Sequence, residues 1–455
     1  MRNNLRNRLL PETLVNAAGK PFYAGRWHRV DVEGIQSISA LSRLPLIDKF
    51  DYVQGGGSFA PSGWPEDGFV NHTSGTSGEP MYRYRSSSEI QYIRDFFAAL
   101  TRRASRQTPG LVLSTNLAAV AHGAAISVPY PAPVIECDME GPDGVEKVID
   151  LLSRPRLVRG AWQYITDLDL GAHQLILLTS TLASRRVDPS TSFKVRLARI
   201  SGAYVSRPTI DRISRFWGGI EVREHFSLSE IFGGASLCGR CSWYHLDPFV
   251  VGEVVNLGSE EIVRSGAGVL VLTELYPFVQ ANPLIRYWTA DLVEATETVC
   301  DPGSPSFRYL GRIFSRRGHV ARGPAKVREE DATESVVLGE GRTGRLVPLL
   351  RPATLIDFLS SLGPVARWGI FGKSLEPIED PLSLGRPKFT ARLGTTASGY
   401  SVLHINVETK PDGQMDSEKL VRQIRTAVLS QNPELAATVT CGRCGLLVTT
   451  SAPSE

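Results

Sequence analysis

A run of hydroxyl and glycine residues at positions 73–80, TSGTSGEP, is the most informative string in this sequence. Its two glycines permit positive φ angles, so successive backbone N–H groups can point into one concavity, and its hydroxyls add further donors. Such a loop suits the phosphates of a nucleotide. It lacks the Gly-Lys-Ser/Thr ending of a P-loop, and no Gly-x-Gly-x-x-Gly pattern surrounds it. Taken alone, the string fits a phosphate-binding loop and a flexible surface loop equally well.

Strands and helices alternate along the first 300 residues. Ser86-x-x-Glu89 is a capping box that predicts a helix, and a second helix is expected from Ser206, with Pro208 in its first turn. Short apolar runs predict strands at Gly110–Ser114, Gln174–Thr179, Ile220–Arg223 and Gly268–Thr273. Strands interleaved with helices favour an α/β fold of layered sheets and helices.

An arginine- and glycine-rich stretch, residues 312–330, interrupts this alternation and is interpreted as a hinge. It predicts a large N-terminal domain, residues 1–312, and a small, mobile C-terminal domain, residues 313–455. The second domain contains an alternating strand, Val402–Val407, and a helix whose apolar face repeats every three to four residues. We therefore expect this domain to be α+β.

Composition excludes several classes of protein. Of 455 residues, 42% are hydrophobic and 21% charged, and a net charge of +3 argues against a nucleic-acid partner. No segment reaches the roughly 18 apolar residues that span a bilayer, and the N-terminus has no apolar signal region. We expect no membrane partner and a cytoplasmic location, where six cysteines indicate metal binding before disulfides. The oligomeric state stays open, a homodimer being one alternative.

The phosphate-loop candidate is followed by three more motifs. They are SGA at residues 201–203, HFSLSE at 225–230 and PLIRYWTADL at 283–292. In this order and at these separations, the four motifs resemble those of the adenylate-forming superfamily, most closely its phenylacetate–CoA ligase branch. The corresponding family strings are SSGTTGKP, YGLSE and PLIRYRTGD. The resemblance covers roughly residues 40–320 and implies an adenylate-forming N-terminal domain.

The resemblance implies a reaction. ATP and a carboxylic acid give an acyl-adenylate and pyrophosphate with Mg²⁺ as cofactor, and a thiol then accepts the acyl group. The branch suggests a small aromatic acid and CoA as co-substrate. An alternative is an adenylate-forming enzyme of natural-product biosynthesis that passes the activated acid to an acyl-carrier-protein thiol, an amine or a hydroxyl, with an unusual acid as one option. A degenerate nucleotide-binding scaffold is a third alternative.

The same resemblance assigns roles around the triphosphate. It places Glu230 on Mg²⁺, and it places Arg316, with Arg312 close behind, at the domain junction where an arginine contacts ribose or phosphate. Catalytic roles follow for Thr73, Glu230 and Arg316. The residues expected around the β- and γ-phosphates are Thr73, Ser74, Gly75, Thr76, Ser77 and Gly78.

The nucleoside is expected at three other segments. Asp291 would accept hydrogen bonds from the ribose hydroxyls, and Phe226, where the family usually has tyrosine, would stack on the purine. The remaining residues expected to line the nucleotide are Ser201, Gly202, Ala203, His225 and Ser227.

Cysteines suggest a second site. Cys238-Gly239-Arg240-Cys241 has zinc-knuckle spacing, His245 follows four residues later, and Cys300 comes just after the Asp291 motif. Together these four side chains could complete a tetrahedral structural zinc site beside the active site. The alternative is a set of free buried thiols.

Three departures from the family pattern stand out. Glu79 replaces the usual lysine of the phosphate loop, and Ala290 replaces the glycine before Asp291. No residue matches the lysine that the family carries near its C-terminus for adenylation. Lys326, Lys373 and Lys388 are the substitutes that the sequence offers.

Overall fold

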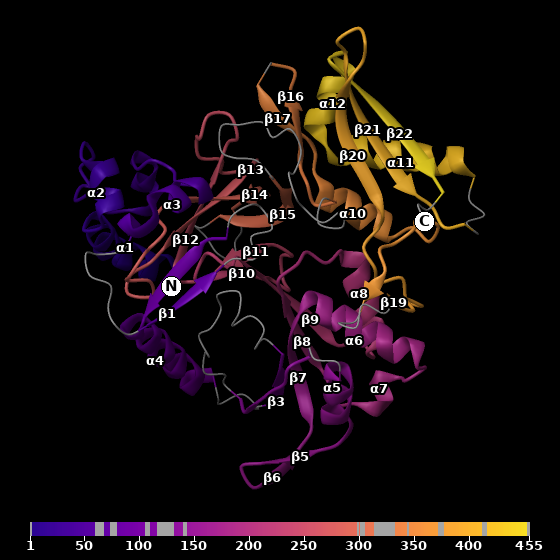
Figure 1. Ribbon diagram of the computed structural model, residues 1–455, viewed down its shortest axis with the longest axis horizontal. Helices are drawn as coiled ribbons and strands as arrows, with labels where there is room; N and C mark the ends of the chain where they lie inside the picture. The colour runs from indigo at the N-terminus through magenta and orange to yellow at the C-terminus, as the bar shows by residue number, and fades with distance from the viewer. Residues whose placement is uncertain are drawn as a thin grey trace.

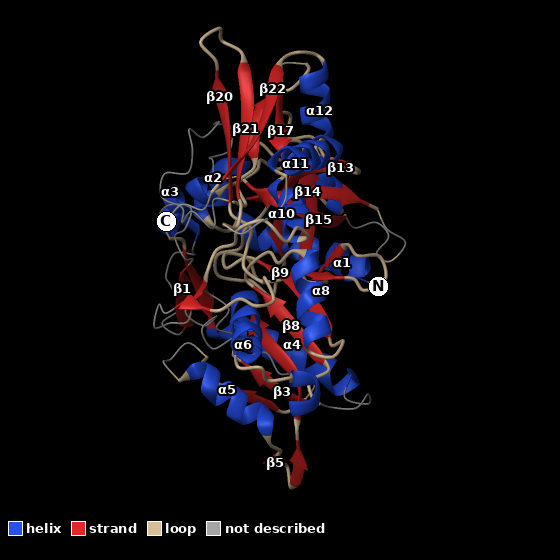
Figure 2. Cartoon of the chain, turned by 90° about the vertical axis from the view of Figure 1, so that its right-hand side faces the viewer, coloured by secondary structure: helices blue, strands red, loops and turns tan. Residues whose placement is uncertain are grey.

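The computed structural model combines one large mixed sheet, two sets of helices against it, and a separate C-terminal layer (Figures 1 and 2). No described helix is both long and apolar enough to cross a membrane. The residues that the structure describes are 2–59, 68–72, 80–104, 110–115, 132–139, 143–297, 300, 305–313, 333–343, 345–371, 377–411 and 416–452.

The central sheet joins a parallel half to an antiparallel half. Its described strands follow the order β12-β13-β14-β15-β11-β10-β9-β8-β7-β3-β4. The parallel strands are β3 (Leu111–Ser114), β4 (Val134–Glu136), β7 (Ile165–Gly171), β8 (Leu197–Ser201) and β9 (Glu221–Ser227). The antiparallel strands are β10 (Gly234–Leu237), β11 (Tyr244–Leu246), β12 (Val250–Val255), β13 (Gly266–Glu274), β14 (Tyr287–Thr296) and β15 (Ser306–Arg312).

Helices cover the parallel half and form one apolar core with it. They are α5 (Gly144–Ser153), α6 (Ala172–Ser184), α7 (Pro189–Ser192) and α8 (Arg207–Phe216). The strand predicted at Gln174–Thr179 is wrong, because these residues form the middle of α6. A short apolar run fits a buried helix as well as a buried strand, and α6 is buried on nearly every side. Strands β3, β9 and β13 and helix α8 agree with the prediction.

N-terminal helices pack against the antiparallel half and share a second core with it. They are α1 (Arg2–Ala18), α2 (Pro21–Trp27), α3 (Lys49–Gly55) and α4 (Ser87–Ala104), with 3₁₀ turns η1 (Ile38–Arg43) and η2 (Gly56–Phe59). One half of the predicted capping box begins α4, since Glu89 N donates to Ser86 Oγ at 3.3 Å, while the Glu89 carboxylate accepts from Gln280 N and Ala281 N. Strand β2 (Tyr82–Ser86) precedes α4 and pairs with β1 (Gly68–His72).

The C-terminal part has its own core. Strands β20 (Phe389–Thr395), β21 (Ser401–Glu408) and β22 (Cys444–Ser451) form a sheet covered by α11 (Ser417–Gln431) and α12 (Pro433–Thr440). The predicted strand and helix are therefore confirmed. Hairpins β5 (Arg156–Val158) with β6 (Ala161–Gln163), β16 (Val337–Glu340) with β17 (Leu346–Leu350), β18 (Ile370–Phe371) with β19 (Pro377–Ile378), and helix α10 (Pro352–Ser360), complete the described elements.

The two parts touch through α8 and α10. Arg212 donates to Ser360 O at 3.0 Å and to Ser383 O at 2.8 Å, and Arg207 N donates to Asp357 Oδ1 at 3.0 Å. The predicted hinge lies mostly in residues 314–332, outside the described residues. In Figure 1 the yellow C-terminal strands lie on the opposite side of the molecule from the indigo helices α1–α3.

Candidate functional site

Two strands bring the central charges of the site together. Asp291 in β14 pairs directly across the ladder with Arg312 in β15, so both side chains are fixed by sheet register. Glu230 follows β9 in sequence and interacts electrostatically with both of them. Asp291 is 2% and Glu230 5% exposed to solvent. Although burial disfavours the charge of Arg312, Asp291 and Glu230 raise its pKa. We call Glu230, Asp291 and Arg312 the charged centre.

Tyr287 links the charged centre to the segment that leaves the glycine-rich string. Its buried hydroxyl donates to Glu230 Oε1 at 3.2 Å and lies 3.6 Å from Met81 Sδ. Met81 directly precedes β2. The pairing of His72 with Tyr82 joins the strands on either side of residues 73–79. The described residues on either side are therefore held in place, and Met81 lies beside Tyr287, the partner of Glu230.

Asp291 carries an unsatisfied acceptor. Its Oδ2 is buried and has no hydrogen-bond partner among the residues that the structure describes. Burial raises the pKa of Asp291 to about 6, although Arg312 opposes this shift. An unpaired buried carboxylate oxygen is costly, and a ligand that supplies hydroxyl donors would satisfy it. The pair Asp291–Arg312 therefore fits a sugar with neighbouring hydroxyls.

The expected adenine-binding residues lie at the carboxyl edge of the parallel strands. Ser201 ends β8 and pairs with His225 in β9, so the segments 201–203 and 225–227 meet at one sheet edge. Ligands of open α/β sheets bind at such carboxyl ends. Gly202 has φ of +89°, which favours glycine, and both Gly202 and Ala203 are exposed.

Phe226 and His225 already have partners. The ring of Phe226 lies 5.4 Å from that of Phe307 and 6.2 Å from that of Tyr244, in edge contacts. His225 contacts Ser236 Oγ at 3.3 Å. Because Phe226 is only half-buried, packing does not exhaust its surface. Its stacking on a purine stays a prediction.

Several predicted residues lie outside the described part of the chain. They are Thr73, Ser74, Gly75, Thr76, Ser77, Gly78, Glu79, Arg316, Lys326 and Lys373. Lys388 is described, and its ammonium lies 3.6 Å from Glu408 Oε2 and 4.9 Å from the centre of the Trp368 ring. These contacts hold Lys388 within the C-terminal part.

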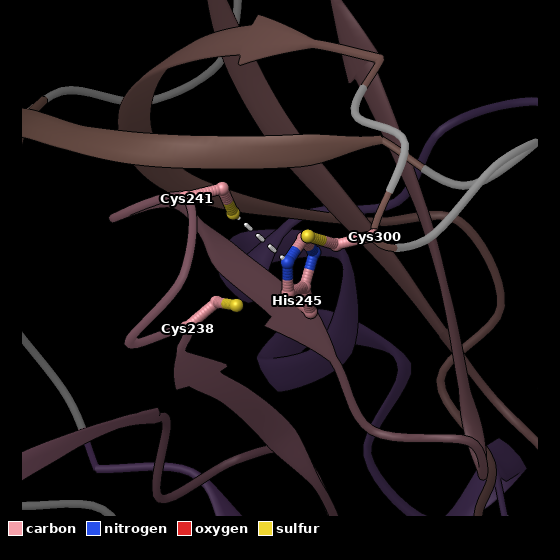
Figure 3. A group of neighbouring side chains, drawn as sticks. All are labelled: Cys238, Cys241, His245 and Cys300. Atoms are coloured by element: carbon pink, nitrogen blue, oxygen red, sulfur yellow. Dashed lines mark hydrogen bonds between the residues drawn. The ribbon is translucent and has the colours of Figure 1, made fainter.

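The cysteine cluster assembles as the spacing predicts. Cys238, Cys241, His245 and Cys300 place one ligand atom each within 4.8 Å of one another (Figure 3). A tetrahedral Zn²⁺ with bonds of about 2.3 Å keeps its ligand atoms about 3.8 Å apart, so the cluster needs to contract by no more than about 1 Å. Backbone hydrogen bonds from Cys241, and secondarily from Arg240, lower the pKa of the Cys238 thiol.

The imidazole of His245 is oriented by its other nitrogen. Nδ1 lies 2.9 Å from Ser306 Oγ, while Nε2 lies 3.2 Å from Cys241 Sγ and faces the thiols. Such an outer partner is typical of a metal-ligating histidine. However, Ser306 begins β15 and Arg312 ends it, so about 20 Å of strand separates the cluster from the charged centre. On the other side of the cluster, His245 pairs with Ser236, which in turn pairs with His225 of the expected nucleotide site. The expectation that the cluster lies beside the active site stays a prediction.

Sequence reasoning missed two residues near the charged centre. Tyr287 stands inside the PLIRYWTADL motif, where the alternation of a strand could have marked it as facing Glu230. Lys49 begins α3, more than 180 residues earlier, and only the fold brings it close. Its pKa is lowered by burial, while Glu230 raises it and Arg312 lowers it.

This chain is similar in structure, but not in sequence, to known proteins. No family model matches the sequence, and no curated protein matches it. A 2-hydroxyisobutyryl-CoA ligase in its postadenylation state has a TM-score of 0.62 and 15% identity, covering 100% of this chain and 86% of that chain. The acyl acid amido synthetase AtGH3.15 has a TM-score of 0.57 and 11% identity, covering 99% and 86%. This chain has the adenylate-forming fold.

Within the adenylate-forming fold, the score depends on the state of the relative. The open form of the same 2-hydroxyisobutyryl-CoA ligase gives 0.62, whereas its thioesterification state gives 0.53, each at 16% identity. The fold that the four motifs predicted is therefore confirmed. The whole chain is more similar to the open and postadenylation forms of that ligase than to its thioesterification form.

Proposed function

We propose that this chain is an ATP- and Mg²⁺-dependent ligase that converts a small aromatic carboxylic acid into its acyl-adenylate and passes the acyl group to CoA. The observation that carries this proposal is the unpaired buried Oδ2 of Asp291 beside Arg312. A carboxylate in this state is an acceptor ready for ribose hydroxyls. The adenylate-forming fold supports the proposal, and the choice of acid and of CoA rests on the motif resemblance.

Each residue of the charged centre has a task in the first step. Asp291 accepts the ribose hydroxyls and fixes the nucleotide, while Arg312 keeps Asp291 ionised. Glu230 would hold Mg²⁺, which neutralises charge on phosphate oxygens. Tyr287 donates to one oxygen of Glu230 and so orients the other. Catalysis is then mainly positioning and charge neutralisation around the α-phosphorus.

The acceptor of the acyl group separates two enzymatic alternatives. Transfer to CoA predicts a thioester product, whereas transfer to a carrier-protein thiol, an amine or a hydroxyl predicts activation without CoA turnover. The amido synthetase of similar fold favours keeping the amine alternative. A nucleotide-binding scaffold would bind ATP and release no pyrophosphate.

One assay distinguishes these functions. The protein is incubated with ATP, Mg²⁺ and a panel of aryl and short-chain acids, and pyrophosphate is measured with and without CoA. Acid-dependent release is expected, and Glu230→Gln should reduce it at least about 100-fold because the metal loses its carboxylate. Unchanged turnover in Glu230→Gln would refute the metal role, and no release with any acid would leave the scaffold.

The cysteine cluster is proposed as a structural zinc site. Three thiols and one imidazole form a closed Cys₃His set without room for substrate, which is typical of structural zinc. Bound Zn²⁺ would tie the β10–β11 turn to the segment between β14 and β15. Elemental analysis of protein purified without chelator should give about one zinc per chain.

A pair of cysteine variants tests the zinc site. Cys238→Ser should lose the metal and lower the melting temperature, whereas Cys441→Ser, an exposed thiol in the C-terminal part, should keep both. A zinc content near zero in the unmodified protein would dismiss this site.

A further inference from the structure

The start of α3 is anchored beside the charged centre. Ile47 forms a parallel bridge with Tyr287: Ile47 N donates to Arg286 O at 3.1 Å, and Trp288 N donates to Ile47 O at 2.8 Å. The next residue, Asp48, caps α3. Its side chain accepts from Asp51 N at 2.9 Å, and Asp51 Oδ2 accepts from Asp48 N at 3.0 Å. These bonds fix Lys49 as the first residue of the helix, next to the strand that carries Tyr287.

The ammonium of Lys49 interacts electrostatically with the charged centre. Its charge interacts with those of Glu230 and Arg312, among others, and its side chain is half-buried. Tyr287, the bridge partner of Ile47, also donates a hydrogen bond to Glu230. Lys49 therefore reaches the charged centre from α3, whereas Arg312 reaches it from β15. Glu79 stands where the motif resemblance expects a lysine, so a cation from another element would restore that charge.

Resting on the proposed function, we propose that Lys49 is a further catalytic residue whose ammonium contacts the α-phosphate. During adenylation a carboxylate oxygen forms a bond to the α-phosphorus. The bond from that phosphorus to the bridging oxygen breaks, and pyrophosphate leaves with the electron pair. Lys49 keeps its proton throughout and neutralises the charge of the non-bridging oxygens.

Binding of two ligands without turnover tests this role. Adenosine and AMP are titrated calorimetrically against the full chain and against Lys49→Gln, without acid or CoA. Because adenosine has no phosphate, its affinity should stay within about twofold. AMP should bind on the order of 10- to 100-fold more weakly, since one ion-paired hydrogen bond is lost. Lys49→Arg should restore most of the loss. Lys194→Gln, which removes an exposed positive charge beyond α7, is the matched control and should bind both ligands normally.

Activity supplies a second readout. In acid-dependent pyrophosphate release, Lys49→Gln should lower kcat by a larger factor than it raises the KM for the acid, because the contact strengthens as charge develops. An unchanged ratio of AMP to adenosine affinity overturns the proposal and leaves the proposed function standing. Equal weakening of both ligands also overturns it, because Lys49 then only shapes α3. Failure of the unmodified protein to bind adenosine instead refutes the proposed function.

Discussion

Two buried groups of charged side chains in this protein differ in whether their carboxylate oxygens have hydrogen-bond partners. In the first, beneath β2 and α4, both oxygens of Glu274 have partners: Oε2 accepts from Arg83 at 2.6 Å and Leu284 N at 2.8 Å, and Oε1 accepts from Phe232 N at 2.8 Å. Glu89 is equally occupied, by Arg85 and by two backbone N–H groups. In the charged centre, Asp291 Oδ2 has no hydrogen-bond partner in the described part of the chain.

This difference separates a structural use of buried charge from a ligand-binding use. The hydrogen bonds of the Glu274 group join β2 and α4 to the turn between β13 and β14, so this group stabilises the fold. The charged centre instead keeps an acceptor open, and burial raises the pKa of Asp291 although Arg312 opposes the shift. Substitutions should therefore affect stability in the first group and nucleotide binding in the second.

The largest effect is expected for Glu274→Ala. It leaves Arg83 and Arg85 buried without their shared carboxylate, so the free energy of unfolding should fall by about 3–5 kcal/mol. Urea denaturation followed by circular dichroism measures it. A loss below about 1 kcal/mol would contradict the division between the two groups.

Asp291→Asn should weaken nucleotide binding and leave stability almost unchanged. The amide replaces a carboxylate whose charge the fold disfavours, so the free energy of unfolding should change by less than about 1 kcal/mol. Adenosine binding should weaken by about 1.5–3 kcal/mol, the cost of losing a charged hydrogen bond. Denaturation and calorimetry on the same preparation test both halves. A large loss of stability with normal adenosine affinity would exchange the roles of the two groups.

Protonation gives a reversible version of that substitution. Since the pKa of Asp291 is about 6, its carboxylate is ionised above that pH and protonated below it. Adenosine affinity should be full at pH 8 and fall as pH drops through 6, reaching about a tenfold loss at pH 5. Asp291→Asn should show no such fall. A wild-type affinity that stays constant from pH 8 to pH 5 would exclude Asp291 as the acceptor.

Motif order predicted much of this arrangement, because each motif is local in sequence. Cys238 and Cys241 lie in one turn, and Asp291 lies in a string that also supplies Tyr287. Distances between motifs depend on sheet register, which short patterns do not encode. The sequence therefore could not say that the length of β15 lies between Ser306, the partner of His245, and Arg312. Lys49 was not predicted because only the pairing of Ile47 with Tyr287 brings it to the charged centre.

The helix α6 marks another limit of prediction. Its residues 175–178 are all apolar, and α6 contacts the sheet, α8 and the β18–β19 hairpin. Amphipathic periodicity is lost when a helix is buried all round. Tertiary packing, not local pattern, decided this element.

The smallest effect concerns the backbone of the charged centre itself. Ala290, directly before Asp291, has φ of +67°, a conformation that costs a residue with a Cβ about 1–2 kcal/mol and glycine little. Ala290→Gly should therefore raise the free energy of unfolding by about 1 kcal/mol. The gain is limited because glycine also makes the unfolded chain more flexible. Denaturation measures the gain, and adenosine calorimetry shows whether Asp291 stays in place. Ala295→Gly, in the same strand at a position without positive φ, is the control and should lose stability. If Ala290→Gly is destabilised as much as this control, the left-handed backbone before Asp291 carries no strain.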